Sequence, residues 1–281
     1  MNGAQRIHDV LANALARDKR VQVLGEALPL SPASAGLLAA CPAQVHLLPA
    51  ADATLIGVAV GMAIGGHRPV VELAGTSALW GALQQLGQEA AAIAGEFSAP
   101  VVVRVPVGPN GFDPTPLLTA VPGLSVACAS TPTDAAALLQ AALTHSGPTV
   151  LLEPMTVLAD TGGPSELPEV PLGSARVVRE GRHVTVLAWG EGVAAAEKAA
   201  NTLAAEDIEA EVVDLRSLSP LDSETIGASV RKTGRCVLVG AGSAALITAI
   251  RAAFLRLESP PTTATATAGR IVEAARSAVH Y

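Results

Sequence analysis

The chain has 281 residues, and its 18 Lys and Arg against 25 Asp and Glu give a formal net charge of −7 with the histidines neutral. This acidic balance argues against nucleic-acid binding and against attraction to anionic lipid surfaces. Hydrophobic residues make up 50% and charged residues 15% of the chain, which excludes a disordered protein and suits one large or two ordinary domains. Aromatic residues make up only 2%, so few side chains can stack on a flat ligand.

The cysteines and the N-terminus indicate the compartment. Cys41, Cys128 and Cys236 lie far apart, without the spacing of a disulfide framework or a zinc site. The N-terminal residues lack the apolar core of a signal peptide, and no stretch offers the roughly 20 consecutive apolar residues of a membrane helix. We therefore expect a cytoplasmic protein with neither a membrane span nor a metal site of its own.

Short aliphatic runs alternate with helical patterns along most of the chain. In the first half the predicted strands are 21–24, 45–48, 70–73, 101–105, 124–127 and 149–152, and the predicted helices between them are 52–64, 79–94 and 133–144. In the second half the predicted strands are 184–189, 210–215 and 236–239, and the predicted helices are 193–205, 223–232 and 244–257. This alternation predicts an α/β fold in which mostly parallel sheets are flanked by helices.

One segment interrupts the alternation. Residues 159–172 are rich in proline, glycine and acidic residues and have no periodicity, which is typical of a linker between domains. The sequence thus predicts one domain over 1–158 and a second, smaller one over 173–281. Within the second domain, residues 259–269 are low in complexity, and we expect them to be poorly packed.

Asp52 is the only charged residue between Glu26 and Arg68, and it stands at the start of an otherwise apolar helix. An aspartate at this place can cap the helix by accepting backbone N–H bonds. It can also be a carboxylate in a dry pocket that shares a proton with the ring nitrogen of a bound heterocycle. From the residues alone, both interpretations stay open.

A glycine-containing turn suggests a different ligand. Gly240, Gly242 and Ala245 follow an aliphatic strand and open a predicted helix, as in a dinucleotide-binding fingerprint. The acidic residue at the expected distance, Glu258, follows a helix, although the fingerprint requires it at the end of a strand. Small residues at such a turn also serve close packing, so the motif alone does not define a nucleotide site.

Several stretches give the chain a resemblance to a known family. It resembles the β subunit of the thiamine-diphosphate-dependent 2-oxoacid dehydrogenase E1 component, of pyruvate or branched-chain type, in the transketolase-like superfamily. The similar stretches include ADATLIG at 51–57, PVVVRVP at 100–106, LLEP at 151–154, EVVDLRSLSPLD at 211–222 and SVRKTGR at 229–235. Their order implies a pyrimidine-binding domain followed by a transketolase C-terminal domain.

The resemblance also implies a cofactor and partners. In this family the β subunit supplies a glutamate to the aminopyrimidine ring of thiamine diphosphate, and an α subunit holds the diphosphate and Mg²⁺ through a GDG…NN motif. No such motif occurs in this sequence. We therefore expect an α-type partner in an α₂β₂-like heterotetramer, self-association of this chain, and an acyltransferase or acyl-carrier acceptor.

The positions of the family's functional residues are altered here. Asp52 stands at the glutamate position, which keeps the charge and shortens the side chain by one methylene. Ala78 stands where the family stacks an aromatic ring on the pyrimidine, and Trp80 lies two positions on. The His-Ser-Gln motif corresponds to residues 110–112, so that Asn110, which cannot titrate, replaces the histidine.

These observations leave three hypotheses. The first is a divergent subunit that binds the pyrimidine half of thiamine diphosphate and acts, with its partner, on a 2-oxo acid or ketose, with transfer of an acyl or two-carbon unit. The second is a catalytically impaired regulatory or structural paralogue. The third is an unrelated dinucleotide-binding α/β protein. The first explains both the retained carboxylate at Asp52 and the long C-terminal similarity.

Overall fold

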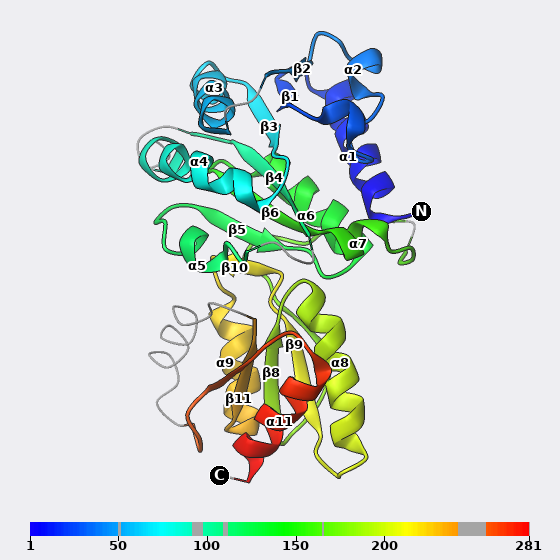
Figure 1. Cartoon of the computed structure of the whole chain (residues 1–281), viewed down its shortest axis with the longest axis vertical. Coiled ribbons are helices and arrows are strands. Elements are labelled where there is room, and N and C mark those ends of the chain that lie inside the picture. The colour runs from blue at the N-terminus through cyan, green and yellow to red at the C-terminus, as the bar shows by residue number, and fades with distance from the viewer. Residues whose placement is uncertain (50–51, 92–97, 109–111, 165, 241–256, 281) are drawn as a thin grey trace. The chain divides into compact units, whose positions relative to one another are not determined.

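A computed structural model describes residues 1–49, 52–91, 98–108, 112–164, 166–240 and 257–280 (Figure 1). The chain divides into two compact units, Met1–Leu172 and Gly173–Tyr281. Each unit contains its own sheet and its own hydrophobic core. The predicted α/β class is confirmed in both.

Unit 1 is built on parallel strands in the order β5-β6-β4-β3-β1-β2. Their bounds are β1 (Val21–Gly25), β2 (Val45–Leu47), β3 (Arg68–Glu72), β4 (Val102–Val107), β5 (Ser125–Cys128) and β6 (Thr149–Pro154). Strands β1, β5 and β6 are buried along their whole length. Burial on both faces explains why these segments are continuous aliphatic runs without alternation.

Helices cover both faces of this sheet (Figure 1). The helices of unit 1 are α1 (Gly3–Arg17), α2 (Leu37–Ala40), α3 (Asp52–Ile64), α4 (Leu79–Gln84), α5 (Thr115–Leu118), α6 (Pro132–Thr144) and α7 (Met155–Ala159). Two short 3₁₀ turns, η1 (Leu28–Leu30) and η2 (Thr76–Ala78), and a π-helical segment, η3 (Gln85–Ala91), complete the unit. Helices α1, α6 and α7 lie on one face, and α3 and α4 lie on the other.

Helix α1 shows how the sequence pattern produces this packing. Ile7, Leu11 and Leu15 recur every four residues and are fully buried against the sheet and α6. Burying each such side chain contributes about 1.5–3 kcal/mol. The Asn2 side chain accepts a hydrogen bond from the Gln5 backbone N–H at 2.9 Å, which satisfies one of the free donors at the helix start.

Helix α6 begins as predicted from its sequence. Thr131 is the N-cap, and its hydroxyl accepts a hydrogen bond from the Asp134 N–H at 3.1 Å while it donates to the Asp134 carboxylate at 2.6 Å. Pro132 occupies the first turn, where a missing N–H costs nothing.

Unit 2 has the strand order β12-β11-β8-β9-β7, parallel except for β7, which runs antiparallel to β9. Its elements are β7 (Arg176–Arg179), β8 (Val184–Ala188), α8 (Glu191–Ala204), β9 (Ala210–Asp214), β10 (Ser217–Ser219), α9 (Ser223–Thr233), β11 (Cys236–Val239), β12 (Thr262–Ala264) and α11 (Ala268–Val279). Helices α8 and α11 share a core with the strands, and α9 packs on β8 and β9.

Three strands of unit 2, β7, β10 (Ser217–Ser219) and β12, were not predicted from the sequence. Residues 259–269 were expected to be poorly packed, but Thr262–Ala264 forms β12, which pairs with β11 and buries Ala264. Thr262 and Thr263 explain the strand, because β-branched side chains favour β-structure even in a segment of low sequence complexity. Strand β7 was not expected, because it lacks a regular buried face. The predicted helix 244–257 and most of the glycine turn after β11 lie outside the described residues.

The segment 159–172, predicted to be a linker, belongs to unit 1 and contacts the rest of that unit at several points. Arg6 of α1 donates hydrogen bonds to the carbonyl oxygens of Gly162 and Pro164, each at 2.8 Å, and the Gly3 N–H donates to the Asp160 carbonyl at 3.1 Å. Val170 is buried in the unit 1 core. These bonds hold the segment against the start of α1.

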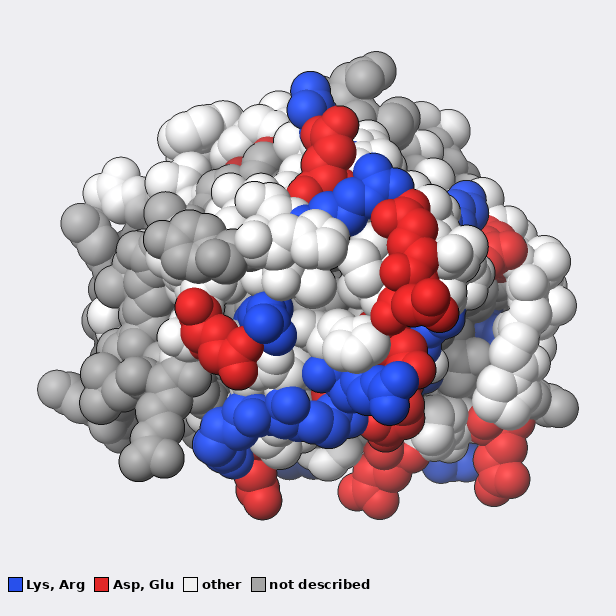
Figure 2. Space-filling model, turned by 90° about the horizontal axis from the view of Figure 1, so that it is seen from below, with Lys and Arg blue, Asp and Glu red and all other residues white. Residues whose placement is uncertain are grey.

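The charged surface is mixed in sign. In unit 2, Lys232 pairs with Glu180 at 2.6 Å, Arg182 with Glu209 at 3.1 Å, and Arg276 with Glu206. Figure 2 shows acidic and basic side chains interleaved on the face that it presents. In the part of the chain that the structure describes, no helix has the length and apolarity needed to cross a membrane.

Candidate functional site

The strand order of unit 1 creates a crevice at one edge of the sheet. From β1 the chain moves outward to β2, whereas from β3 it moves in the opposite direction to β4. The last residues of β1 and β3, Gly25 and Glu72, are direct partners in the ladder. Ligands of parallel α/β sheets bind at such a switch point, beyond the carboxyl ends of the strands.

Asp52 lies at this carboxyl edge, because α3 begins shortly after the end of β2. It is the first residue of α3 and is half-buried. The N-terminal end of a helix stabilises a negative charge. No hydrogen bond to the Asp52 carboxylate is found within the described residues, so its oxygens have free acceptor capacity.

A glycine of α4 makes room for this carboxylate. A Cβ placed on Gly81 would lie 3.4 Å from Asp52 Cβ and 3.6 Å from its Oδ2. The Asp52 side chain is therefore in contact distance of α4 at a position that carries no side chain. Residues after β2 and after β3 thus meet beside one carboxylate.

The two residues expected near the pyrimidine ring have opposite environments. Ala78 ends the η2 turn and is 6% exposed, so its methyl group is committed to packing. Trp80 in the first turn of α4 is 61% exposed and stacks on Phe112, with ring centroids 4.9 Å apart and planes inclined by 19°. Asn110 lies outside the described residues.

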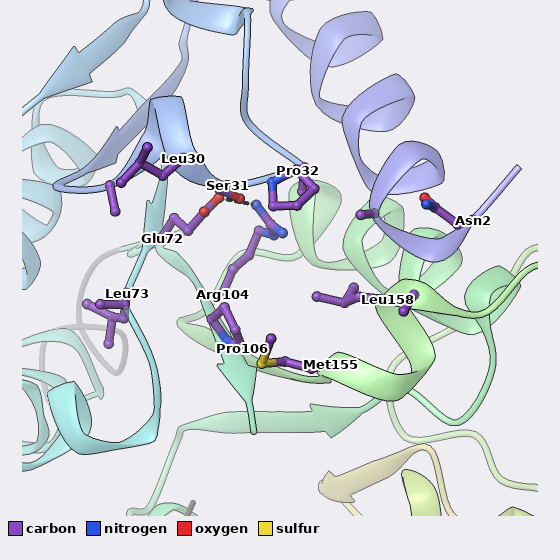
Figure 3. Close-up of a pocket in the computed structure, with 15 residues that line it drawn as sticks. Asn2, Leu30, Ser31, Pro32, Glu72, Leu73, Arg104, Pro106, Met155 and Leu158 are labelled. Atoms are coloured by element: carbon purple, nitrogen blue, oxygen red, sulfur yellow. Dashed lines mark hydrogen bonds and ion pairs between the residues drawn. The ribbon is translucent and has the colours of Figure 1, made fainter. Parts of the chain in front are cut away.

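A buried ion cluster lies on the opposite face of the sheet from α3 and α4. Arg104 of β4 is 1% exposed, and its Nε and Nη2 donate to the two carboxylate oxygens of Glu153, each at 2.8 Å. Its Nη1 donates to Glu72 Oε2 at 2.6 Å. The Ser34 hydroxyl also donates to Glu72 Oε2 (Figure 3 draws Glu72 and Arg104).

Burial and charge act against each other in this cluster. Burial alone would lower the pKa of Arg104, but the neighbouring Glu153 and Glu72 carboxylates outweigh it and raise the pKa above the ordinary arginine value. Burial raises the pKa of Glu153, and the charge of Glu72 adds to this rise while Arg104 opposes it. Two carboxylates thus share one buried guanidinium, so the cluster depends on Arg104.

Comparisons with known proteins agree along the chain. The transketolase pyrimidine-binding domain matches residues 1–159, and the transketolase C-terminal domain matches residues 173–280. The pyruvate dehydrogenase E1 component subunit beta of Acholeplasma laidlawii is 35% identical over 92% of this chain and 86% of that protein. The chain belongs to the transketolase-like E1 β family.

Two further relatives are consistent with this family. The mitochondrial 2-oxoisovalerate dehydrogenase subunit beta of Chaetomium thermophilum is 34% identical over 92% of this chain and 62% of that protein. A solved structure described as a split gene transketolase, inactive beta4 tetramer, superposes with a TM-score of 0.81 over 100% of this chain and 98% of that chain. At 22% identity it supports the fold alone. Membership in the E1 β family implies thiamine diphosphate as the cofactor.

Two features of this family member were not predicted from its sequence. The stacking of Phe112 on Trp80 joins residues after β3 and β4, and nothing in the local sequence pairs them. The Arg104 cluster left a signal, since Glu72, Arg104 and Glu153 each interrupt an aliphatic strand with a charge. Single charges in buried strands require partners, and only the strand register reveals which ones they are.

Proposed function

We propose that this chain is the β subunit of a heteromeric thiamine-diphosphate-dependent enzyme that acts on a 2-oxo acid or a ketose. It supplies the pyrimidine half of an active site shared with an α-type chain, and the product is an acyl or two-carbon unit passed to an acceptor. The half-buried Asp52 carboxylate at the switch point carries this proposal. The family membership supports it over most of the chain's length.

The residues present fit the pyrimidine end of the cofactor. A carboxylate with free acceptor oxygens can accept a hydrogen bond from a ring N–H, and Asp52 has this capacity within the described residues. The exposed Trp80 ring, backed by Phe112, offers a flat surface for a heterocycle. When bound, thiamine diphosphate supplies a nucleophilic carbon for cleavage of the bond next to a carbonyl group.

The protein's own contribution is to hold charge and to orient the ring. Asp52 is placed to keep a ring nitrogen protonated and to orient the ring, helped by the positive end of α3. Gly81 leaves space for the carboxylate, and Trp80 follows the η2 turn on the same helix as Gly81. Phe112 fixes the indole plane, which reduces the freedom lost when a ligand stacks on it.

We propose that the α-type partner holds the diphosphate and Mg²⁺, since the chain lacks the GDG…NN motif. The assembly is then an α₂β₂-like heterotetramer that contains a pair of β chains and hands its acyl unit to an acyltransferase or acyl carrier. Cys41, Cys128 and Cys236 are free thiols, which fits the reducing cytoplasm.

A regulatory or structural role is the second candidate, and the burial of Ala78 favours it. No ring can stack from that position, so the surviving contacts to the pyrimidine reduce to Asp52 and Trp80. On this hypothesis the assembly surface persists, while the complex does not bind the cofactor.

Titration calorimetry on the co-expressed complex separates the two candidates. We expect thiamine diphosphate and Mg²⁺ to bind the wild-type complex, and Asp52→Asn to lower turnover by at least about 10²-fold because the proton acceptor is lost. Glu224→Gln is the control, since it removes an exposed carboxylate from the first turn of a different helix. Absence of cofactor binding by an intact wild-type complex would establish the regulatory role.

A further inference from the structure

A second cavity lies at the same switch point, on the face of the sheet that carries α1 and α7 (Figure 3). It encloses about 440 Å³, which is within the range of small-molecule sites. The turn after β1, the ends of β3 and β4, the start of α1 and helix α7 form its walls. Neither Asp52 nor Trp80 lines it, so it is separate from the proposed pyrimidine site.

The walls are apolar, and the mouth exposes large hydrophobic side chains. Pro32, Leu73 and Leu158 are among the apolar lining residues. Leu30 is 85% exposed and Met155 is 54% exposed, and both belong to the lining. Exposed apolar side chains around a hollow commonly mark a binding site, because covering them removes apolar surface from water.

One charged group on this wall has an oxygen without a hydrogen-bond partner. Glu72 is 7% exposed and lines the cavity together with Arg104. Its Oε2 accepts from Arg104 Nη1 and from the Ser34 hydroxyl. Across the described residues, Glu72 Oε1 accepts no hydrogen bond.

The charges of the cluster are also unbalanced, with an excess of negative charge. The guanidinium of Arg104 donates from Nε and Nη2 to Glu153, and its Nη1 donates to Glu72 Oε2 and, at 3.4 Å, to the Ser34 hydroxyl oxygen. With both carboxylates ionised, two negative charges face one positive charge. A cation beside Glu72 Oε1 would therefore neutralise the buried excess, whereas an anion would add to it.

We propose that this cavity binds a small primary ammonium compound with an apolar body. The ammonium group donates to Glu72 Oε1, and Ser31, which lies beside Glu72 in Figure 3, offers a hydroxyl oxygen as a further acceptor. The apolar body lies along Leu30 and Leu158. A neutral molecule of the same shape gains the apolar contacts but brings no positive charge to Glu72 Oε1.

The three methionines of the chain permit a direct test on the full-length protein. Met155 lines the cavity, whereas Met62 lies on α3, on the opposite face of the sheet. In a protein labelled with ¹³C at the methionine methyl groups, n-hexylammonium should shift the Met155 signal saturably and leave the Met62 signal unchanged. Hexanol and hexanoate should bind more weakly, in that order.

Two variants and one control test whether the amine binds in this cavity. Glu72→Gln preserves shape and an acceptor oxygen but removes the charge, and it should weaken n-hexylammonium binding by about tenfold or more. Asp9→Asn removes an exposed carboxylate of α1 and should change nothing. Ala27 is a half-buried lining residue outside the ion cluster, so Ala27→Phe should fill the cavity. This variant should abolish the Met155 shift, and it tests the proposal even if Glu72→Gln folds poorly.

Three results would overturn the proposal. The first is a Met155 signal unmoved by millimolar n-hexylammonium. The second is binding of hexanol as tight as that of the amine. The third is unchanged amine affinity in a folded Glu72→Gln protein. Because Asp52 takes no part, these results are independent of cofactor binding at the pyrimidine site.

Discussion

Carboxylates occupy two contrasting surroundings on the two faces of the unit 1 sheet. Glu72 and Glu153 are buried and share the guanidinium of Arg104. Asp52 is half-buried at a helix start, beside a glycine and near an exposed ring. The contrast shows that burial with a fixed counter-charge stabilises the fold, while carboxylate oxygens that accept no hydrogen bond among the described residues, those of Asp52 and Oε1 of Glu72, are available for a ligand.

Removal of Arg104 should give the largest effect, because it leaves two carboxylates buried without a counter-charge. We expect Arg104→Met to reduce the free energy of unfolding by about 3–5 kcal/mol at neutral pH. Urea denaturation measures this change. The control Arg20→Met breaks an exposed pair with Asp18 and should change the free energy of unfolding far less, because water and salt screen the pair. Equal losses in the two variants would remove the distinction between the two kinds of carboxylate.

A third carboxylate sharpens the comparison, since Asp222 also stands at a helix start but has both oxygens occupied. Its Oδ1 accepts from the Thr225 N–H at 2.9 Å, and its Oδ2 accepts from the Ala175 N–H at 2.9 Å. We expect Asp222→Ala to lower the free energy of unfolding by about 0.5–2 kcal/mol, as for other N-caps, and Asp52→Ala to lower it by less. A larger loss for Asp52→Ala would indicate a mainly structural role for Asp52.

The Asp222 carboxylate should also make the free energy of unfolding depend on pH. Burial tends to raise the pKa of Asp222, but hydrogen bonds from the backbone of Thr225 and Ala175 outweigh it and hold the pKa below the ordinary value of 3.8. A lowered folded-state pKa stabilises the protein above the unfolded pKa, and this stabilisation is lost as the pH falls through the folded value. Wild type and Asp222→Asn should therefore differ in unfolding free energy at neutral pH and converge below about pH 4. Parallel curves down to low pH would contradict this assignment.

The smallest expected effect concerns the exposed ring. Trp80→Ala should weaken thiamine diphosphate binding by the assembled complex by about 0.5–1.5 kcal/mol, roughly 2–10-fold, because one stacking surface is lost. Trp80→Phe keeps a ring and should recover most of the affinity. Calorimetry on both variants measures the effect. If the Trp80→Ala complex binds thiamine diphosphate as tightly as the wild-type complex, Trp80 and Phe112 are not part of the cofactor site.

The sequence alone predicts features that depend on residues adjacent in the chain. Helix α3 begins and ends at the predicted residues, because Asp52 opens a long apolar run that Gly65 and Gly66 terminate. The cap of α6 follows equally from adjacent residues. The Arg104 cluster could not be predicted, since it requires the register that sets Glu72 opposite Arg104 and brings Glu153 beside them from β6.

The candidate site was predictable only as a set of positions. The parallel order of β2 and β3 explains why Asp52 and residues near Ala78 converge on one edge, and Asn110 lies outside the described residues. The exposure of Trp80, the burial of Ala78 and the partnership with Phe112 depend on how α4 packs against α3, which a single sequence does not specify. Strand β12 was missed for a related reason, because its pairing with β11 joins it to residues distant in the chain.

The two outermost strands of the unit 2 sheet limit how copies of this chain can join. Strand β7 has four residues with an irregular register, and Arg176 and Arg179 stand at its ends; β12, on the other side, has three residues. Edge strands that are short, irregular or carry arginine resist pairing with a strand of another molecule. Continuation of this sheet from one molecule into the next is therefore disfavoured, so association of unit 2 has to proceed through its helices and loops, which also protects the chain against strand-by-strand aggregation.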